Sequence, residues 1–232
     1  MVLKGQYLER PAVIVREPAS GDSPGLVLEG LFHRGERAPA VVICAPHPAL
    51  GGSMDSPVVA ELAWAFTRSG HATLRFNYQG VGASGGVRRV SAPGGTTLAL
   101  SALEPEIADA SAAAWHLSQS TAHGSIALCG YSFGAAVALG LALRQPTRSP
   151  LLLVAPPTTL FDFSPLASFD RPVWIGFGDR DPYVDSHRLS PLARQSFGHL
   201  DVFPGSDHVF TRGLTALGTH AAAWLDENGH EP

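Results

Sequence analysis

Short apolar runs recur along the chain and, after the first three, alternate with stretches of helical periodicity. Several runs are apolar throughout, which is typical of strands that are buried on both faces of a parallel sheet. The alternation predicts an α/β fold with a mostly parallel eight-stranded sheet and helices on both faces. The strands are expected at residues 12–16, 25–33, 38–45, 72–78, 125–129, 151–155, 173–177 and 200–203.

The clearest helical pattern covers residues 56–69, where Ser56 is expected to cap the helix and Gly70 to end it. The stretch 84–103 is rich in Gly, Ser, Ala and Pro and predicts a long loop, either the rim of a functional site or an ordinary surface loop. No repeat or linker divides the chain, so residues 1–232 are expected to form a single domain. Further helices are predicted over residues 104–119, 133–144, 185–195 and 211–227.

Composition narrows the possible partners. With 45% hydrophobic residues, 16% charged residues and a net charge of −4, the chain can bury a core but offers no basic surface for nucleic acid. Charged residues interrupt the first 16 positions, so neither a signal peptide nor a membrane span is expected there, and a cytoplasmic protein without a membrane partner is the default. The two cysteines, Cys44 and Cys129, each end an apolar run and are expected to be buried free thiols.

One motif carries a candidate nucleophile. Residues 124–144 read GSIALCGYSFGAAVALGLALR, an apolar strand followed by the pattern GxSxG and then by a helix-like stretch. This strand, tight turn and helix is the context of a nucleophile elbow, in which a strained turn exposes a hydroxyl at the N-terminus of a helix. Ser132 is therefore the predicted nucleophile.

A serine hydroxyl needs a base, and the base needs a carboxylate that fixes its tautomer. Two later segments supply both: VWIGFGDRDPYV presents Asp179 and Asp181 after a strand, and LDVFPGSDHVF presents Asp207 and His208 after the next. The order Ser132, Asp181, His208 is that of α/β hydrolases, and each residue follows a strand, at the sheet edge where sites of α/β folds lie. Asp179 remains the alternative acid, and Asp207 is expected to bond its own loop.

The chain resembles the α/β-hydrolase superfamily over nearly its whole length. It is most similar to small bacterial serine hydrolases without a cap domain, through the segments APHPALGGSMD at residues 45–55 and RFNYQGVGASGG at residues 75–86. It departs from that group in having Ala45 where another His is frequent and Gln79 where Arg is usual. The resemblance implies an α/β-hydrolase fold without a large cap, and it favours Asp181 as the acid because a GxxD pattern begins at Gly178.

An oxyanion formed during acyl transfer must meet backbone N–H groups that already point at it. The amide of Phe133, next to the nucleophile, is one expected donor. By resemblance, the second comes from the loop after His47, where Pro48 has no N–H and Ala49 or Leu50 is the candidate. Four side chains are expected to contact the substrate: His47, Tyr131, Phe161 and Phe163, with Phe161 and Phe163 on a small apolar flap.

The predicted function is hydrolysis of a small carboxylic ester, of short to medium acyl length, through a Ser-His-Asp triad and an acyl-enzyme. No cofactor is required, and no spacing of His or acidic residues suggests a metal site. An amidase or peptidase, a thioesterase or an acyltransferase could use the same residues, because a triad does not fix the leaving group. A scaffold that binds a ligand or protein without turnover is the alternative of another class. Whether the chain is a monomer or a homodimer stays open.

Overall fold

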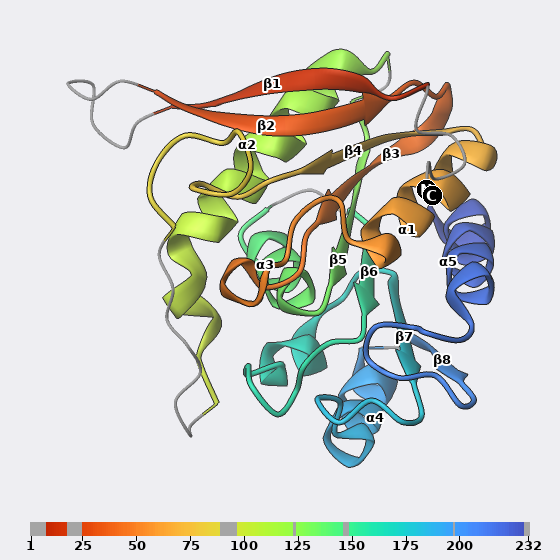
Figure 1. The fold of residues 1–232 in the computed structure, drawn as a ribbon. Coiled ribbons are helices and arrows are strands. Elements are labelled where there is room, and N and C mark those ends of the chain that lie inside the picture. Colours follow the sequence, from red (N-terminus) through yellow and green to blue (C-terminus); the bar gives the residue numbers. More distant parts are fainter. Residues whose placement is uncertain are drawn as a thin grey trace.

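A single eight-stranded sheet runs through the computed structural model, in the strand order β1-β2-β4-β3-β5-β6-β7-β8 (Figure 1). The structure describes residues 8–17, 25–88, 97–122, 124–145, 149–196 and 198–229. β1 and β2 are antiparallel to each other and β2 is antiparallel to β4, whereas all other neighbours are parallel. The strands are β1 (Arg10–Arg16), β2 (Leu26–His33), β3 (Arg37–Cys44), β4 (His71–Phe76), β5 (Ile126–Tyr131), β6 (Leu151–Val154), β7 (Val173–Gly178) and β8 (His199–Phe203).

These strands confirm the predicted fold class and lie where the apolar runs indicated. Every residue of β4, β6 and β7 is buried, because helices cover both faces of the sheet at these positions. β8, at the edge, is instead mostly half-exposed or exposed.

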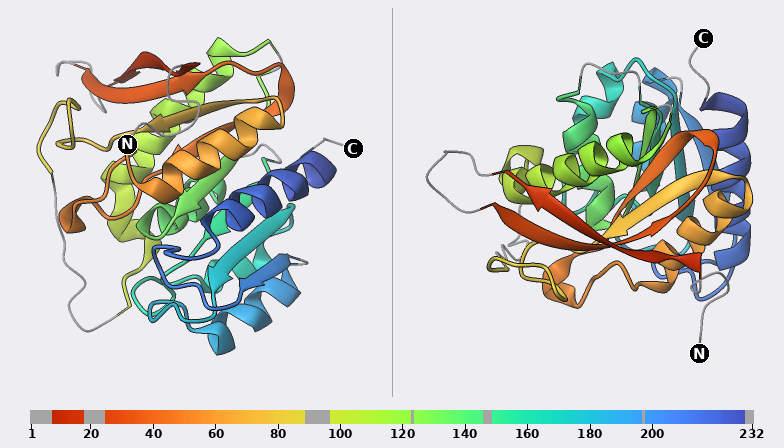
Figure 2. Two further views of the ribbon diagram at one scale, coloured as in Figure 1. Left: turned by 45° about the vertical axis from the view of Figure 1, so that its right-hand side comes forward. Right: turned by 90° about the horizontal axis from the view of Figure 1, so that it is seen from above.

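Helices form a layer on each face of the sheet (Figure 2). α1 (Pro57–Arg68) and α5 (Leu214–Asn228) pack together over one apolar cluster, and α2 (Glu104–Ser120), α3 (Phe133–Ala142) and α4 (Ser186–Gln195) contribute to the cluster on the other face. Every residue of α3 is buried. The helix that follows the candidate nucleophile is therefore enclosed by protein on all sides, which holds its first turn in a fixed place.

Three local expectations need correction. Ser56 stands at the N-cap of α1, before Pro57 in the first turn, but its side chain makes no capping bond. The last four residues of the predicted loop 84–103 form a short 3-10 helix, η3 (Leu100–Leu103), for which the sequence shows no periodic pattern. α5 begins at Leu214 rather than near Thr211, because the amide and hydroxyl of Thr211 both bond Asp207.

The predicted loop and the predicted N-terminal stretch both include residues that the structure does not describe. Residues 89–96 of the predicted loop and residues 1–7 of the N-terminal stretch lie outside the described part of the chain. Among the helices that the structure describes, none has the length and apolar character needed to cross a membrane.

Cys44 and Cys129 are free and fully buried, as predicted. They lie on the neighbouring strands β3 and β5, where Cys129 pairs with Ile43, so the two thiols belong to the clusters on opposite faces of the sheet. Burial raises the pKa of the Cys44 thiol to about 12 and that of Cys129 well above its usual value. Both thiols therefore stay protonated at neutral pH and serve as packing groups.

A buried carboxylate ties α2 to the sheet. Asp109 accepts a hydrogen bond from Arg16 of β1 at 2.6 Å and another from the backbone N–H of Gln79, beyond β4, at 2.9 Å. Burial raises the pKa of Asp109 to about 6, against the lowering effect of these two donors. Asp109 thus joins three elements through a charge that is costly to hold in the interior.

Candidate active site

Ser132 occupies a strained turn between β5 and α3. Its backbone has φ 56° and ψ −120°, a positive φ that residues with a side chain rarely adopt. An added Cβ at Gly130 would overlap the Gly134 carbonyl, and one at Gly134 would overlap the carbonyl of Cys44. The two glycines of the motif are therefore required by close backbone packing, and this packing turns the Ser132 side chain outward from the carboxyl edge of the sheet.

Three side chains meet at this edge in one hydrogen-bonded line. The Ser132 Oγ lies 2.8 Å from His208 Nε2, and His208 Nδ1 lies 2.7 Å from Asp181 Oδ2. The Asp181 side chain is fully buried, whereas the His208 side chain keeps 17% of its surface exposed. The carboxylate is thus shielded from water while the imidazole remains within reach of a substrate, which is the arrangement that general-base activation of a hydroxyl requires.

The other two acidic candidates are engaged elsewhere. Asp179 accepts a hydrogen bond from the backbone N–H of Gly205 at 2.7 Å, so it braces the β7 turn against the β8 loop. Asp207 accepts from both the amide and the hydroxyl of Thr211. Asp207 thus bonds its own loop, as expected, and of the two candidate acids the structure brings Asp181, not Asp179, to His208.

The predicted oxyanion loop forms a tight turn beside Phe133. η2 (Pro48–Leu50) follows His47, whose imidazole Nδ1 accepts the Ala49 N–H at 3.1 Å and whose carbonyl accepts the Leu50 N–H at 3.1 Å. The His47 ring lies 4.6 Å from the Phe133 ring, measured between centroids. Phe133 is the first residue of α3, so its own N–H has no partner within the helix.

A cavity of about 360 Å³ opens beside this loop. It includes His47 and Phe161, two of the residues predicted to contact substrate, together with Phe133. Phe163 does not line the cavity, although it is as deeply buried as Phe161. The predicted apolar flap does not form, because Phe161, which bridges to Leu98, and Phe163, which precedes η4 (Ser164–Ser168), both pack into the main core.

Tyr131 also lies away from the cavity, and its contacts are with His208. Its buried hydroxyl donates to the His208 carbonyl at 3.0 Å, and the two ring centroids are 5.7 Å apart. A second tyrosine, Tyr183, places the edge of its ring against the His208 imidazole, with centroids 4.8 Å apart and planes at 66°. Nothing in the pattern around Tyr183 singles it out in sequence.

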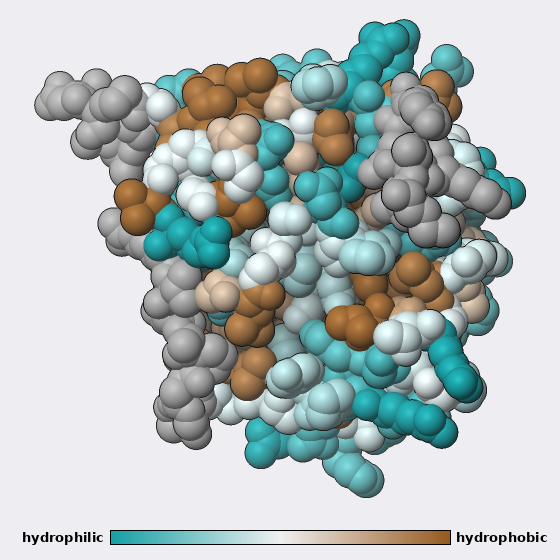
Figure 3. Space-filling model, viewed as in Figure 1, coloured by the Kyte–Doolittle hydropathy of each residue, from teal (hydrophilic) through white to brown (hydrophobic). Residues whose placement is uncertain are grey.

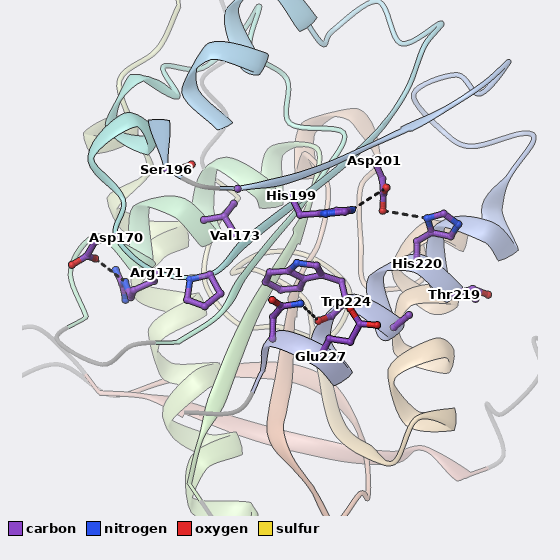
Figure 4. Close-up of a pocket in the computed structure, with 14 residues that line it drawn as sticks. Asp170, Arg171, Val173, Ser196, His199, Asp201, Thr219, His220, Trp224 and Glu227 are labelled. Carbon is purple, nitrogen blue, oxygen red and sulfur yellow. Dashed lines mark hydrogen bonds and ion pairs between the residues drawn. The ribbon is translucent and has the colours of Figure 1, made fainter. Parts of the chain in front are cut away.

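A wide cavity of about 1080 Å³ lies at the opposite end of the strands, beside the first residues of β7 and β8 and the end of α5 (Figure 4). Asp201 stands there between His199 and His220, each 3.2 Å away, and also accepts the indole N–H of Trp174 at 2.8 Å. These polar groups bond one another, and among the described residues no hydrogen bond joins a serine or cysteine to either imidazole. The hydrogen-bonded line of Ser132, His208 and Asp181 at the carboxyl edge is therefore the stronger candidate site, although the cavity near it is smaller.

Comparisons with known proteins identify the family of the chain. Residues 38–167 match the family model described as serine aminopeptidase, S33. An uncharacterized protein of Rickettsia prowazekii is 32% identical over 184 residues, which is 75% of this chain and 72% of that protein.

Two solved structures share the architecture along almost the whole chain. An α/β serine hydrolase homologue from Coxiella burnetii is 28% identical, covers 97% of this chain and 99% of its own, and superposes with a TM-score of 0.77. A serine hydrolase without a lid from Xanthomonas campestris is 23% identical, covers 97% of both chains, and has a TM-score of 0.74, which shows the fold. The chain is therefore an α/β hydrolase of the serine hydrolase type, and it belongs to the serine aminopeptidase S33 family.

Proposed function

We propose that the protein hydrolyses small carboxylic esters through Ser132, His208 and Asp181. His208 takes the hydroxyl proton as Ser132 attacks the ester carbonyl, and it returns that proton to the departing alcohol. Water, activated by the same imidazole, then releases the acid from the acyl-enzyme. The observation that carries the proposal is the continuous hydrogen-bonded line from Asp181 to Ser132, at 2.7 Å and 2.8 Å.

The tetrahedral intermediate would be stabilised by two amides. The Phe133 N–H, at the head of α3, has no helical partner and benefits from the helix dipole. Between the two loop candidates, Ala49 is favoured over Leu50. The Ala49 N–H bonds a side chain, the His47 imidazole, which can rotate away, whereas the Leu50 N–H bonds the His47 backbone and helps to form the turn.

The cavity beside the His47 loop and Phe133 supports a small substrate, although Ser132 and His208 are not among the residues that line it. A cavity of about 360 Å³ is at the lower end of the roughly 300–1,000 Å³ that ligand pockets span. Its walls at Phe133 and Phe161 suit an apolar acyl group of short to medium length. The face in Figure 3 carries small apolar areas separated by polar residues rather than one broad apolar area, which favours a dissolved ester over a lipid surface.

Aminoacyl amides are the second candidate, because the matching family is described as serine aminopeptidases. The same three residues can cleave an amide or an ester, so the leaving group must be determined by assay. A panel of nitrophenyl esters of increasing chain length, beside aminoacyl anilides and thioesters, compares these classes directly. We expect the highest kcat/KM for short to medium esters; a higher value for anilides or thioesters would assign the other reaction.

Labelling by a fluorophosphonate probe separates an enzyme from a binding scaffold. The intact protein should be labelled, and Ser132→Ala should not. Ser206→Ala provides a matched control, because Ser206 is a buried serine on the loop of His208 whose hydroxyl bonds the Arg212 carbonyl. Labelling that persists in Ser132→Ala, or that is missing from the intact protein, would refute the proposed nucleophile.

A further inference from the structure

In the proposed reaction His208 must keep its hydrogen bonds to Asp181 and Ser132 while it accepts and returns a proton. It sits on the connection between β8 and α5, beyond the end of a strand at the edge of the sheet, and its side chain is 17% exposed. A loop in such a place has fewer packing partners than the elbow at the centre of the sheet. The loop therefore needs contacts that fix both its backbone and the imidazole ring.

The first of these contacts is a hydrogen bond from Tyr131 to the His208 backbone. Tyr131 is the last residue of β5, is 3% exposed, and donates its hydroxyl hydrogen bond to the His208 carbonyl at 3.0 Å. β5 pairs with β3 on one side and β6 on the other, so this bond links the His208 backbone to an interior strand of the sheet. Burial raises the pKa of the Tyr131 phenol well above its usual value, so the group remains a donor at any pH where the protein works.

The second contact comes from the solvent side. The Tyr183 ring presses edge-on against the imidazole, with centroids 4.8 Å apart, and is 40% exposed. Both backbone polar groups of Tyr183 are hydrogen-bonded. The N–H donates to Asp181 Oδ1, and the carbonyl accepts hydrogen bonds from the amide and the hydroxyl of Thr159. The Tyr183 backbone is thus tied to the same carboxylate that bonds His208, while its ring contacts the imidazole.

We propose that Tyr131 and Tyr183 are positioning residues that hold His208 from two sides, Tyr131 through its backbone and Tyr183 through its ring. This inference rests on the proposed function, since it assigns the two tyrosines to the same reaction. It implies that the sequence GYSFG contributes two groups to the site, the Ser132 nucleophile and the Tyr131 hydroxyl. It also implies that a flat ring, rather than a phenol hydroxyl, is what position 183 requires.

Three variants test these roles separately. Tyr131→Phe removes only the hydroxyl, Tyr183→Leu removes the ring, and Tyr183→Phe keeps the ring while it removes a hydroxyl for which the structure shows no bond. Ser196→Ala is the matched control for loss of a buried hydroxyl, because Ser196 bonds the backbone carbonyls of Leu192 and Ala193 far from the site.

We expect Tyr131→Phe and Tyr183→Leu each to lower kcat on nitrophenyl butyrate about tenfold, since small displacements of a catalytic group reduce the rate steeply. KM should change less than twofold, and Tyr183→Phe and Ser196→Ala should keep the kcat of the unmodified protein. Equal kcat in all four variants would overturn the proposal, as would an equal loss in Tyr183→Phe and Tyr183→Leu.

Nuclear magnetic resonance of the His208 imidazole gives a readout that does not depend on turnover. In the unmodified protein the Nδ1 proton, bonded to Asp181, should give a sharp low-field signal. That signal should broaden in Tyr131→Phe and Tyr183→Leu and stay sharp in Tyr183→Phe and Ser196→Ala. An unchanged signal in the first two variants would refute the positioning role even where ester hydrolysis is present, and broadening would support it even if esters prove to be the wrong substrate.

Discussion

The role of Asp181 can be tested by replacing one of its carboxylate oxygens with an NH₂ group, in the variant Asp181→Asn. In Asp181→Asn, the Tyr183 N–H still needs an oxygen acceptor, which Asp181 Oδ1 provides at 2.9 Å. The Asn oxygen should keep that bond, so its NH₂ group takes the place of Oδ2 opposite His208 Nδ1. Nδ1 must then accept rather than donate, which moves the imidazole proton to Nε2. The base would present a proton to Ser132 instead of a lone pair.

The size of the effect follows from this exchange of tautomers. In a serine protease the equivalent replacement lowers kcat about 10⁴-fold with the geometry intact, which corresponds to roughly 5–6 kcal/mol of activation free energy. We expect a loss of the same order here, measured as kcat on nitrophenyl butyrate at pH 7.5, with little change in KM. Thermal unfolding should show that the variant remains folded, because the shape of the side chain is unchanged.

Asp179→Asn and Asp207→Asn are the matched controls for this measurement. Both remove a carboxylate from the same two loops, but those carboxylates bond Gly205 and Thr211 rather than His208. Each should keep kcat within about tenfold of the unmodified protein. A kcat of Asp181→Asn within tenfold, or an Asp179→Asn variant that is equally impaired, would refute the assignment of the acid.

Three further predictions concern glycine packing, the cavity wall and the buried carboxylate of Asp109. Gly134→Ala should yield little folded protein because its Cβ would overlap a backbone carbonyl, whereas Gly205→Ala, which has open space at a φ of +71°, should lose only about 1–2 kcal/mol in urea unfolding. Phe161→Ala should cost about 3–5 kcal/mol of stability and move the best acyl length upward in the ester panel, because it enlarges the cavity; an unchanged optimum would exclude Phe161 from the acyl site. Since burial raises the pKa of Asp109 to about 6, the unfolded state binds fewer protons than the native state between about pH 4 and pH 6. The free energy of unfolding should therefore fall by up to about 3 kcal/mol as pH rises through this range, and the fall should be missing in Asp109→Asn.

The sheet and helices could be predicted because their signals are strong and local. Strands buried on both faces read as continuous apolar runs, and the elbow at Ser132 combines a motif with a strand before it and a helix after it. The approximate place of Asp181 and His208 followed from topology, since both come directly after strands whose carboxyl ends share one edge. These inferences need only the order of the elements and not their packing.

Contacts that depend on side-chain direction could not be predicted. Phe161 and Phe163 are the same residue type two positions apart and are equally buried, yet only Phe161 lines the cavity. Tyr131 was expected at the substrate and instead bonds a backbone carbonyl 77 positions away in sequence. The bond between Arg16 and Asp109 likewise joins distant positions, and no local pattern records such a pairing.

The register of the sheet links the three loops that carry the site. The Ser132 N–H donates to the carbonyl of Val154 in β6, and the Ala155 N–H donates to that of Gly176 in β7. Gly178 of β7 in turn pairs with Phe203 of β8. A slip of one residue in any of these ladders would move a loop by about 3.3 Å, more than the length of either hydrogen bond to His208. The geometry of the site therefore depends on the register of β5 to β8 as much as on the three side chains themselves.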